Sequence, residues 1–334
     1  MPSTIKDTGS LRAMTKVAHL YYRRGLVQTE IAEELGLSQA GVSRLLTAAS
    51  EQGIARTVVV PPSGFHNDLE QAVEETFGLR EVHVIETEAG SGDDLVPALA
   101  RALVPVLQLA PIDGRTIGLT SWSRALQAAV DALPDLPRAN AGHIVELLGD
   151  VGRPSLQHRA ALTTERFARA TGGDPVFLRA PGVVSTPDMR AALLEGDPHA
   201  RRALRAMDDL DLALVGIGEV RASEPLTPGE NFFTDAQFAS ARAQGAVGEI
   251  GLRFLDAAGE PVAVELGDLV LGMELSQLRR AKRRIAVAGG RRKHAAVLAA
   301  VRGGWIDVLV TDETTARHLV ACGPNGVDTH LRHS

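Results

Sequence analysis

A group of polar side chains suited to nucleic-acid contacts lies near the start of the chain, between residues 28 and 47. Gln39 carries an amide that can read the edge of adenine, and Arg44 carries a guanidinium that can bind guanine or a phosphate. Short hydroxyls around them suit phosphate oxygens. The residues expected to contact DNA are Gln28, Thr29, Ser38, Gln39, Ala40, Gly41, Ser43, Arg44 and Thr47.

Two short helices are needed to position these side chains. Apolar residues share one face over 28–35, Gly36-Leu37-Ser38 interrupts the pattern, and a second amphipathic segment covers 39–52. Gly36 tolerates the positive φ of a tight turn, and Ser38 can accept an N–H at the start of the second helix. In a helix-turn-helix of this kind the second helix enters the major groove. The alternative interpretation is two core helices with a solvated face.

A second set of candidate residues lies in four segments rich in glycine, serine or cations. A helix N-terminus offers free N–H groups to an anion, which suits 120–124 and 289–293. The three cations at 291–293 oppose the helix dipole, and an anionic ligand such as a sugar phosphate would offset that repulsion. The candidate ligand-binding residues are Thr120, Ser121, Ser123, Arg124, Gly216, Gly218, Glu249, Gly289, Gly290 and Lys293.

Simpler interpretations stay open for each of these segments. Ser123 can be an ordinary helix cap, the cations at 291–293 can be a solvated surface, and 248–251 can be a plain turn. The glycines at 216 and 218 lack the third glycine of a dinucleotide fingerprint, so they indicate room for a ligand or for a neighbouring loop.

From residue 79 onward, short apolar segments alternate with amphipathic helical ones. This alternation predicts an α/β fold with a Rossmann-like, mostly parallel sheet covered by helices on both faces. Ligands of such sheets bind beyond the carboxyl ends of the strands, where the four candidate segments are expected. The expected strands are 81–87, 115–120, 143–149, 174–181, 212–218, 283–290 and 305–312.

Pro61-Pro62-Ser63-Gly64 marks the expected boundary between two domains. We expect a helix-turn-helix domain over 1–60, in which 11–22 forms a supporting helix after a frayed start and 54–60 forms a strand resembling a wing. A linker is expected over 61–68. An effector-binding and oligomerisation domain is expected over 69–334, beginning with a helix over 68–78 and containing a hairpin turn at 256–259.

Composition excludes several classes of protein. The 334 residues contain no apolar run of the about 18 residues that a membrane span requires, and the first ten residues do not form a signal peptide. Cys322 is alone, so there is no disulfide framework. We therefore expect a cytoplasmic protein. No metal, cofactor or catalytic motif such as HExxH, GxSxG or CxxC is found, so nothing in the sequence indicates an enzyme.

The charge is unevenly distributed along the chain. Residues 1–60 carry seven Lys or Arg against five Asp or Glu, whereas the whole chain has a net charge of −6. Only the N-terminal part therefore suits a polyanion. Because its surplus of positive charge is small, one copy should bind phosphates weakly. We expect a homo-oligomer, a dimer or tetramer, that binds a repeated site.

Six stretches of the chain resemble the SorC family of bacterial sugar-responsive transcription regulators, over nearly the whole length. They are KVAHLYYRRGLVQTEIAEELGLSQAGVSRLL (16–46), SWSRAL (121–126), LLGDVG (147–152), LVGIGEV (214–220), GEIGLRFLDAAGEPV (248–262) and VAGGRRKHAAVLAAVRGGWIDVLVTDETTA (287–316). The resemblance implies an N-terminal helix-turn-helix that binds operator DNA. It also implies an effector domain related to glucosamine-6-phosphate deaminase, which binds a phosphorylated sugar and assembles a tetramer or a dimer of dimers.

The chain departs from the family pattern in the candidate ligand site. A loop that often reads Trp-Gly-x-Thr reads Trp122-Ser123-Arg124-Ala125 here, Gly-Asp-Ile becomes Gly248-Glu249-Ile250, and Leu269 replaces a frequent arginine. The segment Gly289-Gly290 with Lys293 is retained, which favours phosphate binding there.

The main hypothesis is a sequence-specific DNA-binding regulator controlled by a small sugar or sugar-phosphate effector. One alternative is a sugar-phosphate isomerase or deaminase with an appended DNA-binding domain, for which Glu249 is the only candidate base. A constitutive DNA-binding scaffold is the other alternative.

Overall fold

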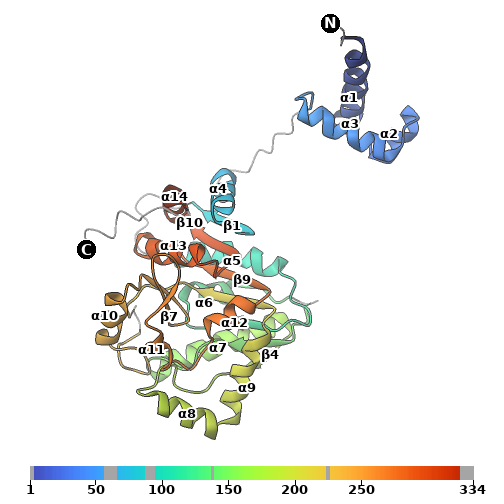
Figure 1. Ribbon diagram of the computed structural model, residues 1–334. Helices are drawn as coiled ribbons and strands as arrows, with labels where there is room; N and C mark the ends of the chain where they lie inside the picture. Colours follow the sequence, from blue (N-terminus) through green and yellow to red (C-terminus); the bar gives the residue numbers. More distant parts are fainter. Residues whose placement is uncertain (1–3, 56–65, 87–94, 137–138, 223–225, 324–334) are drawn as a thin grey trace. The chain divides into compact units, whose positions relative to one another are not determined.

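The computed structural model divides into two compact units, Met1–Pro62 and Ser63–Ser334 (Figure 1). It describes residues 4–55, 66–86, 95–136, 139–222 and 226–323. The break between units falls inside the proline-rich stretch, and the first described helix of the C-terminal unit begins at Asn67. Residues 61–65 of the expected linker lie outside the described residues.

Three helices form the N-terminal unit: α1 (Thr4–Arg24), α2 (Gln28–Leu35) and α3 (Gln39–Glu51). Val17 and Leu20 of α1 pack with Ile31 of α2 and with Val42 and Leu46 of α3. The frayed start expected over residues 1–10 is wrong from Thr4 onward, because α1 begins there. No proline interrupts residues 4–10, so the helix propagates from its packed part toward the N-terminus.

The turn between α2 and α3 has the predicted chemistry. Gly36 adopts a left-handed conformation with φ 63°, and the Ser38 hydroxyl accepts a hydrogen bond of 3.1 Å from the Gly41 N–H. These local contacts end one helix and begin the next. Of the strand expected at 54–60, Ile54 and Ala55 are not in a strand, and 56–60 lie outside the described residues.

The C-terminal unit is built on a seven-stranded parallel sheet, which confirms the predicted fold class. In spatial order, its strands are β1 (Glu81–Ile85), β10 (Val308–Asp312), β9 (Arg283–Val287), β5 (Leu212–Gly216), β2 (Ile117–Leu119), β3 (His143–Glu146) and β4 (Asp174–Val176). The strands are shorter than predicted. β4 ends five residues before the expected 181, because Pro181 and Val183 pair instead with Asp150 and Val270.

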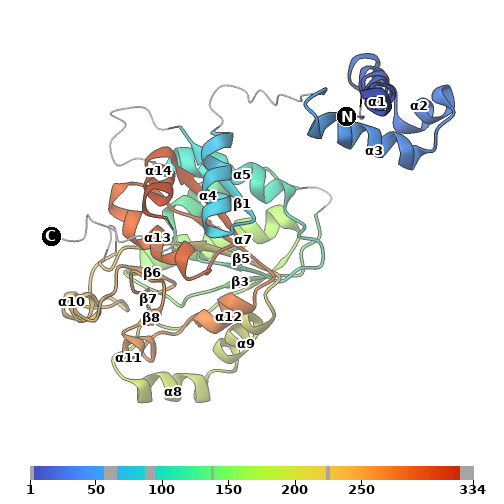
Figure 2. The ribbon, with the colours of Figure 1, turned by 45° about the horizontal axis from the view of Figure 1, so that its top comes forward.

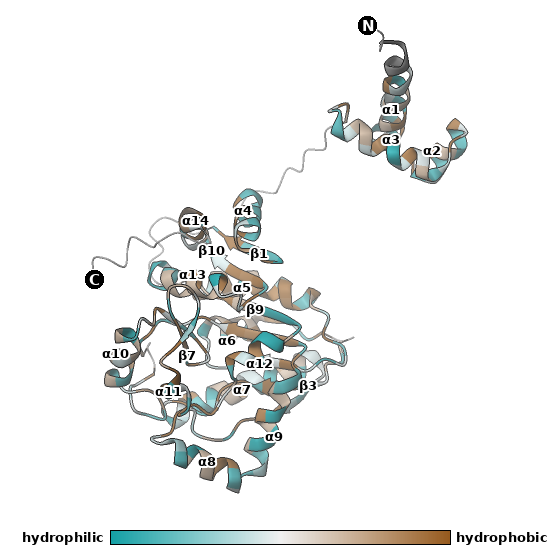
Figure 3. Cartoon of the chain, in the orientation of Figure 1, coloured by the Kyte–Doolittle hydropathy of each residue, from teal (hydrophilic) through white to brown (hydrophobic). Residues whose placement is uncertain are grey.

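Helices cover both faces of this sheet, because successive strand residues point to opposite sides. Leu212 and Leu214 share one core with the helices α5 (Val96–Leu109), α6 (Arg124–Ala132) and α7 (Pro154–Thr171). Ala213 and Val215 belong to the other core. That core includes α4 (Asn67–Phe77), α9 (Pro198–Ala206), α12 (Leu275–Arg280), α13 (His294–Arg302) and α14 (Glu313–Cys322). Figure 2 shows the two layers, and Figure 3 shows the apolar strands between them.

A small antiparallel sheet forms a third core. Its strands are β6 (Gly248–Ile250), β7 (Arg253–Leu255) and β8 (Pro261–Val262). The predicted hairpin turn is confirmed, since the Asp256 N–H donates to the Glu260 carbonyl. Beside this sheet lie α8 (Pro187–Gly196), α10 (Asp235–Ala243) and α11 (Val264–Gly267), and short 3₁₀ turns occur at Met207–Asp209 and Arg291–Lys293. α10 was not predicted, although Thr234 and Gln237 form a capping box at its start.

Each helix that the structure describes is too short or too polar to cross a membrane.

The cap at Ser38 provides a test of this local structure. Ser38→Ala should destabilise α3 by about 0.5–2 kcal/mol, because the Gly41 N–H loses its acceptor. Hydrogen exchange of the α3 amides in the full chain measures the loss. Ser50→Ala is the control, because Ser50 is an exposed residue near the end of α3. Equal exchange in the two variants would contradict the role of the cap.

Candidate functional site

The strand order reverses between β2 and β5. After β2 the chain continues to β3 on one side of it, and after β5 it continues toward β9 on the other side. The connections that follow these two neighbouring strands therefore run in opposite directions. Such a reversal opens a crevice at the carboxyl ends of the strands. Here the Thr120 hydroxyl accepts a 3.0 Å hydrogen bond from the Gly216 N–H and donates to the Leu214 carbonyl at 3.4 Å. Two segments predicted separately from the sequence are therefore joined.

The loop after β2 leads directly into α6. Ser123 caps this helix by accepting from the Leu126 N–H, as the simpler interpretation had it, and it also contacts Gly216, where a Cβ would lie 3.0 Å from its side chain. Ser121 is 1% exposed, and its hydroxyl has no hydrogen-bond partner among the described residues. Arg124 is exposed at the first position of α6, where its charge opposes the helix dipole.

The loop after β5 is joined to the small sheet. Gly218 and Glu249 exchange two backbone hydrogen bonds, of 2.9 and 3.0 Å. A Cβ on Gly218 would overlap the Glu249 carboxylate, so the glycine is needed because a neighbouring side chain lies against it. Glu249 Oε2 accepts from the Leu252 N–H at 2.6 Å, within the tight turn between β6 and β7. Burial raises the pKa of Glu249, and this hydrogen bond and nearby Lys293 partly oppose the rise.

Lys293 brings the fourth segment to the same place. Its ammonium donates a 2.8 Å hydrogen bond to the Ile217 carbonyl, just beyond β5. Burial lowers the pKa of Lys293, whereas the carboxylates of Glu249 and Glu219 raise it and the charges of Arg124 and Arg292 lower it further. All four predicted segments therefore contribute charged or polar groups to one cluster, which we call the switch-point cluster.

Two members of this cluster were missed by sequence reasoning. Glu219 follows the glycines of the loop after β5, and its carboxylate lies 2.7 Å from Arg221 and 3.7 Å from Arg292. Asp312 ends β10, and its Oδ2 accepts hydrogen bonds from the Gly290 N–H at 2.6 Å and from the Thr315 hydroxyl at 2.6 Å. The available signal was the order strand, Asp312, then helix, which is typical of an N-cap.

The Gly289-Gly290 loop differs from a free phosphate cradle. Gly290 has φ 95°, and its N–H donates to Asp312 and to Thr315, so it is already bonded within the protein. A Cβ on Gly289 would overlap the Asp312 carboxylate, which explains the need for glycine at this position. Of the cations at 291–293, Lys293 and Arg292 contact other members of the cluster.

A separate charged group lies at the ends of β3 and β4. Arg179 is 2.8 Å from Glu146 and 3.1 Å from Asp150, and Glu146 is almost fully buried. Burial raises the pKa of Glu146, and the charge of Arg179 opposes the rise. This guanidinium already has two carboxylate partners. Arg124 has no ion pair with any described carboxylate, so of the two it is the one available to a ligand.

The residues predicted to contact DNA lie mainly on one face of α3. Gln39, Ser43, Arg44 and Thr47 are exposed, whereas Val42 and Leu46 between them are buried. The Thr47 hydroxyl donates to the Ser43 carbonyl within the helix at 3.2 Å. Ala40 and Ser38 are also exposed at its start, Thr29 is exposed on α2, and Gln28 and Gly41 are half-buried.

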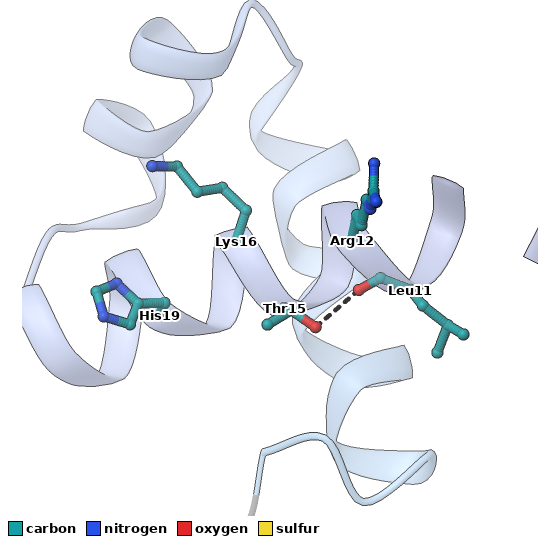
Figure 4. A pocket seen from close by; sticks show the side chains of 5 residues that line it. All are labelled: Leu11, Arg12, Thr15, Lys16 and His19. Carbon is teal, nitrogen blue, oxygen red and sulfur yellow. Dashed lines mark hydrogen bonds between the residues drawn. The ribbon is translucent and has the colours of Figure 1, made fainter. Parts of the chain in front are cut away.

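An open pocket of about 420 Å³ lies over α1 (Figure 4). It is lined by Leu11, Arg12, Thr15, Lys16 and His19, all on the side of α1 away from buried Met14, Val17 and Leu20. None of the predicted ligand-binding segments contributes to it.

The switch-point cluster has the chemistry of a binding site for a small polar ligand. Arg124, Arg292 and Lys293 supply positive charge, and Glu219 and Glu249 can accept hydrogen bonds from hydroxyls. In the described part of the chain, no three His, Cys, Asp or Glu residues are grouped so that they could hold a metal ion.

This chain is similar to known proteins over most of its length. Residues 62–321 match the family model described as "Putative sugar-binding domain". The sorbitol operon regulator of Klebsiella pneumoniae is 29% identical over 322 residues, covering 95% of this chain and 100% of that protein. The full-length crystal structure of that regulator, SorC, superposes with a TM-score of 0.69 at 28% identity, covering 93% of this chain and 99% of that chain. The chain belongs to the SorC family.

Other relatives support the same class. The deoxyribonucleoside regulator of Bacillus subtilis (strain 168) is 32% identical over 305 residues, covering 91% of this chain and 96% of that protein. The transcriptional regulator LsrR of Escherichia coli (strain K12) is 31% identical over 309 residues, covering 91% of this chain and 92% of that protein. This SorC-family chain is thus a sugar-responsive transcription regulator and not an enzyme, so the isomerase or deaminase alternative is wrong.

The close approach at Gly218 provides a test of the cluster geometry. Gly218→Ala should destabilise the C-terminal unit by about 1–3 kcal/mol, because the new methyl group displaces Glu249. Chemical denaturation of the full chain measures the change. Gly196→Ala, at the end of α8 with open space around it, is the control and should have little effect. Wild-type stability in Gly218→Ala would show that Glu249 is free to move away.

Proposed function

We propose that this SorC-family regulator binds operator DNA through α3 and that a small phosphorylated sugar binds in the switch-point cluster and changes operator affinity. The observation that carries the proposal is the convergence of four distant segments at the point where strand order reverses. Thr120 binds Gly216, Gly218 binds Glu249, and Lys293 binds the Ile217 carbonyl. Such a switch point is where open α/β sheets bind small ligands.

The charges of the cluster favour an anionic, hydroxylated ligand. A lysine ammonium has three donors, and the Ile217 carbonyl takes one of those on Lys293. Arg124 adds a guanidinium that can bind phosphate oxygens in pairs, and an anion there would relieve the repulsion between Arg124 and the N-terminus of α6. Glu249, whose carboxylate lies against Gly218, would accept hydrogen bonds from sugar hydroxyls. The family model for a sugar-binding domain supports the same ligand class.

The geometry of α2 and α3 supports DNA binding. The two helices with the Gly36 turn form a helix-turn-helix, and the exposed face of α3 carries an amide, a guanidinium and two hydroxyls. The small positive surplus of residues 1–60 favours binding as a homo-oligomer, in which two or more copies contact repeated half-sites. An effector that couples to such binding typically changes operator affinity by about 1–3 kcal/mol, or roughly 5–150-fold.

Arg44 is the first residue to change in the DNA-binding half. Arg44→Ala should weaken operator binding by about 1–3 kcal/mol if the guanidinium makes a paired contact with a base. Fluorescence anisotropy against operator and unrelated DNA at fixed salt measures the loss. Arg12→Ala, on the outward face of α1, is the matched control for loss of one positive charge. Equal effects of the two variants would remove Arg44 from the residues that read sequence.

The effector half is tested by a thermal-shift screen against sugars, polyols and their phosphates. A ligand at about 100 times its dissociation constant adds about 2.7 kcal/mol to stability, which is readily detected. We expect a phosphorylated sugar to stabilise the protein more than its unphosphorylated parent. Lys293→Ala should abolish this response and leave ligand-free DNA binding intact, because Lys293 lies in the C-terminal unit.

Two other results of this screen would change the interpretation. Loss of both activities in Lys293→Ala would indicate misfolding rather than a binding role. Silence of the wild-type protein across the whole panel would contradict the sugar-phosphate effector and favour a constitutive DNA-binding scaffold.

A further inference from the structure

α4 closes the free edge of the main sheet with two carboxylates. β1 is an edge strand, and its N–H groups at Val82 and Val84 donate to Glu74 and Glu70 of α4, both at 2.8 Å. Outward N–H groups of an edge strand normally meet water or another strand. Here two glutamates one helical turn apart satisfy them, and Figures 1 and 2 show α4 beside β1 in both views. α4 is thereby fixed to the sheet by specific polar bonds.

α4 is also the first described element after the break between the two units. The break falls at Pro62, and α4 begins at Asn67. α4 is therefore the described element of the C-terminal unit that lies nearest in sequence to the N-terminal unit.

Asp312 is hydrogen-bonded both to the loop that carries Lys293 and to the start of α14. Its Oδ2 binds the Gly290 N–H of the loop that carries Lys293. Its Oδ1 accepts from the N–H groups of Thr314 at 3.0 Å and Thr315 at 3.2 Å, and so caps α14. Asp312 is 0% exposed, and its hydrogen-bond donors among the described residues are neutral N–H and O–H groups.

Asp312 reaches α4 by two routes. In the parallel pairing of β10 with β1, Asp312 lies opposite Ile85. β1 is also the strand whose N–H groups donate to Glu70 and Glu74 of α4. Asp312 also caps α14, whose Leu319 packs in the same core as Val73 of α4. Burial raises the pKa of Asp312, but the hydrogen bonds from Thr314, Thr315 and Gly290 outweigh it and hold that pKa below its ordinary value. The carboxylate is therefore ionised at neutral pH, and losing one donor is costly in its buried setting.

We propose that Asp312 is the positioning residue that transmits effector binding from the 289–293 loop to α4. The proposal rests on the proposed function for its ligand, but its contacts exist without ligand. A ligand that engages Lys293 moves or fixes the loop, and the Gly290 N–H bond passes this change to Asp312. β10, which ends at Asp312, and α14, which Asp312 caps, pass it to β1 and α4. If Asp312 couples the two, a change of Asp312 must alter both the 289–293 loop and α4.

Hydrogen exchange of the full chain, without any ligand, tests the physical connection. Asp312→Asn should speed exchange in the 289–293 loop and also in α4 and β1, by roughly tenfold, as expected when hydrogen bonds to a charged group are weakened. The matched control is Asp307→Asn, which removes a carboxylate that binds the Arg284 N–H and guanidinium at the opposite end of β10. Faster exchange in Asp312→Asn that stops at the loop and α14, with α4 unchanged, would overturn the proposal.

The far end of the connection is tested with variants of the two half-buried glutamates of α4, which leave Asp312 unchanged. The double variant Glu70→Ala/Glu74→Ala should bind the ligand found in the thermal-shift screen as the wild type does. The ratio of its operator affinities with and without ligand should nevertheless fall toward one. Glu70→Gln/Glu74→Gln retains oxygen acceptors for Val82 and Val84 and should keep the wild-type ratio.

These outcomes separate the inference from the proposed function. A wild-type ratio retained by the double alanine variant would overturn the role of α4 while leaving the effector site in place. A wild-type protein that binds no sugar phosphate removes the proposed effector. The exchange experiment then still decides whether Asp312 joins the loop to α4.

Discussion

The hydrogen bond between the Thr120 hydroxyl and the Gly216 N–H joins the ends of β2 and β5, the two strands between which the strand order reverses. The candidate site depends on this constraint. If β2 and β5 were not neighbours, the loops that follow them would leave the sheet at different places, and Ser123 would not contact Gly216. The rest of the cluster is added to this pair, because Glu249 bonds to the loop after β5 and Lys293 bonds to the carbonyl of Ile217.

The charges in the C-terminal unit are used in two different ways. Arg179 lies between Glu146 and Asp150, so its charge is neutralised where it stands. In the switch-point cluster, the pKa of Lys293 is lowered mainly by burial, with Glu249 and Glu219 opposing and two arginines adding to the effect. Cations gathered around a partly buried lysine are stabilised by an added anion, whereas a closed ion pair has no need of one. This difference is why the cluster, rather than the Arg179 group, is the proposed effector site.

Glycines in this protein mark places where other parts of the chain come close. Gly218 lies under the Glu249 carboxylate and Gly289 under that of Asp312, so neither position has room for a side chain. The sequence pattern predicts room for a ligand or for a neighbouring loop at Gly218, and an anion site at 289–293. The groups that occupy this room are carboxylates of the protein itself. The Gly290 N–H accordingly donates its hydrogen bond to Asp312, the residue that we propose connects this loop to α4.

The sequence by itself determined those features that depend on residues close together in the chain. The caps at Gly36 and Ser38, the alternation of strands and helices, and the turn at 256–259 follow from contacts within a few residues, which pattern and residue type reveal. The motifs also identified the family. The tertiary structure alone decided that four segments meet at one switch point, that Glu219 joins them, and that Asp312 holds Gly290. It also decided that Glu70 and Glu74 close the edge of β1. Each of these contacts joins residues from different elements, so its existence depends on strand order and register, which no local pattern encodes.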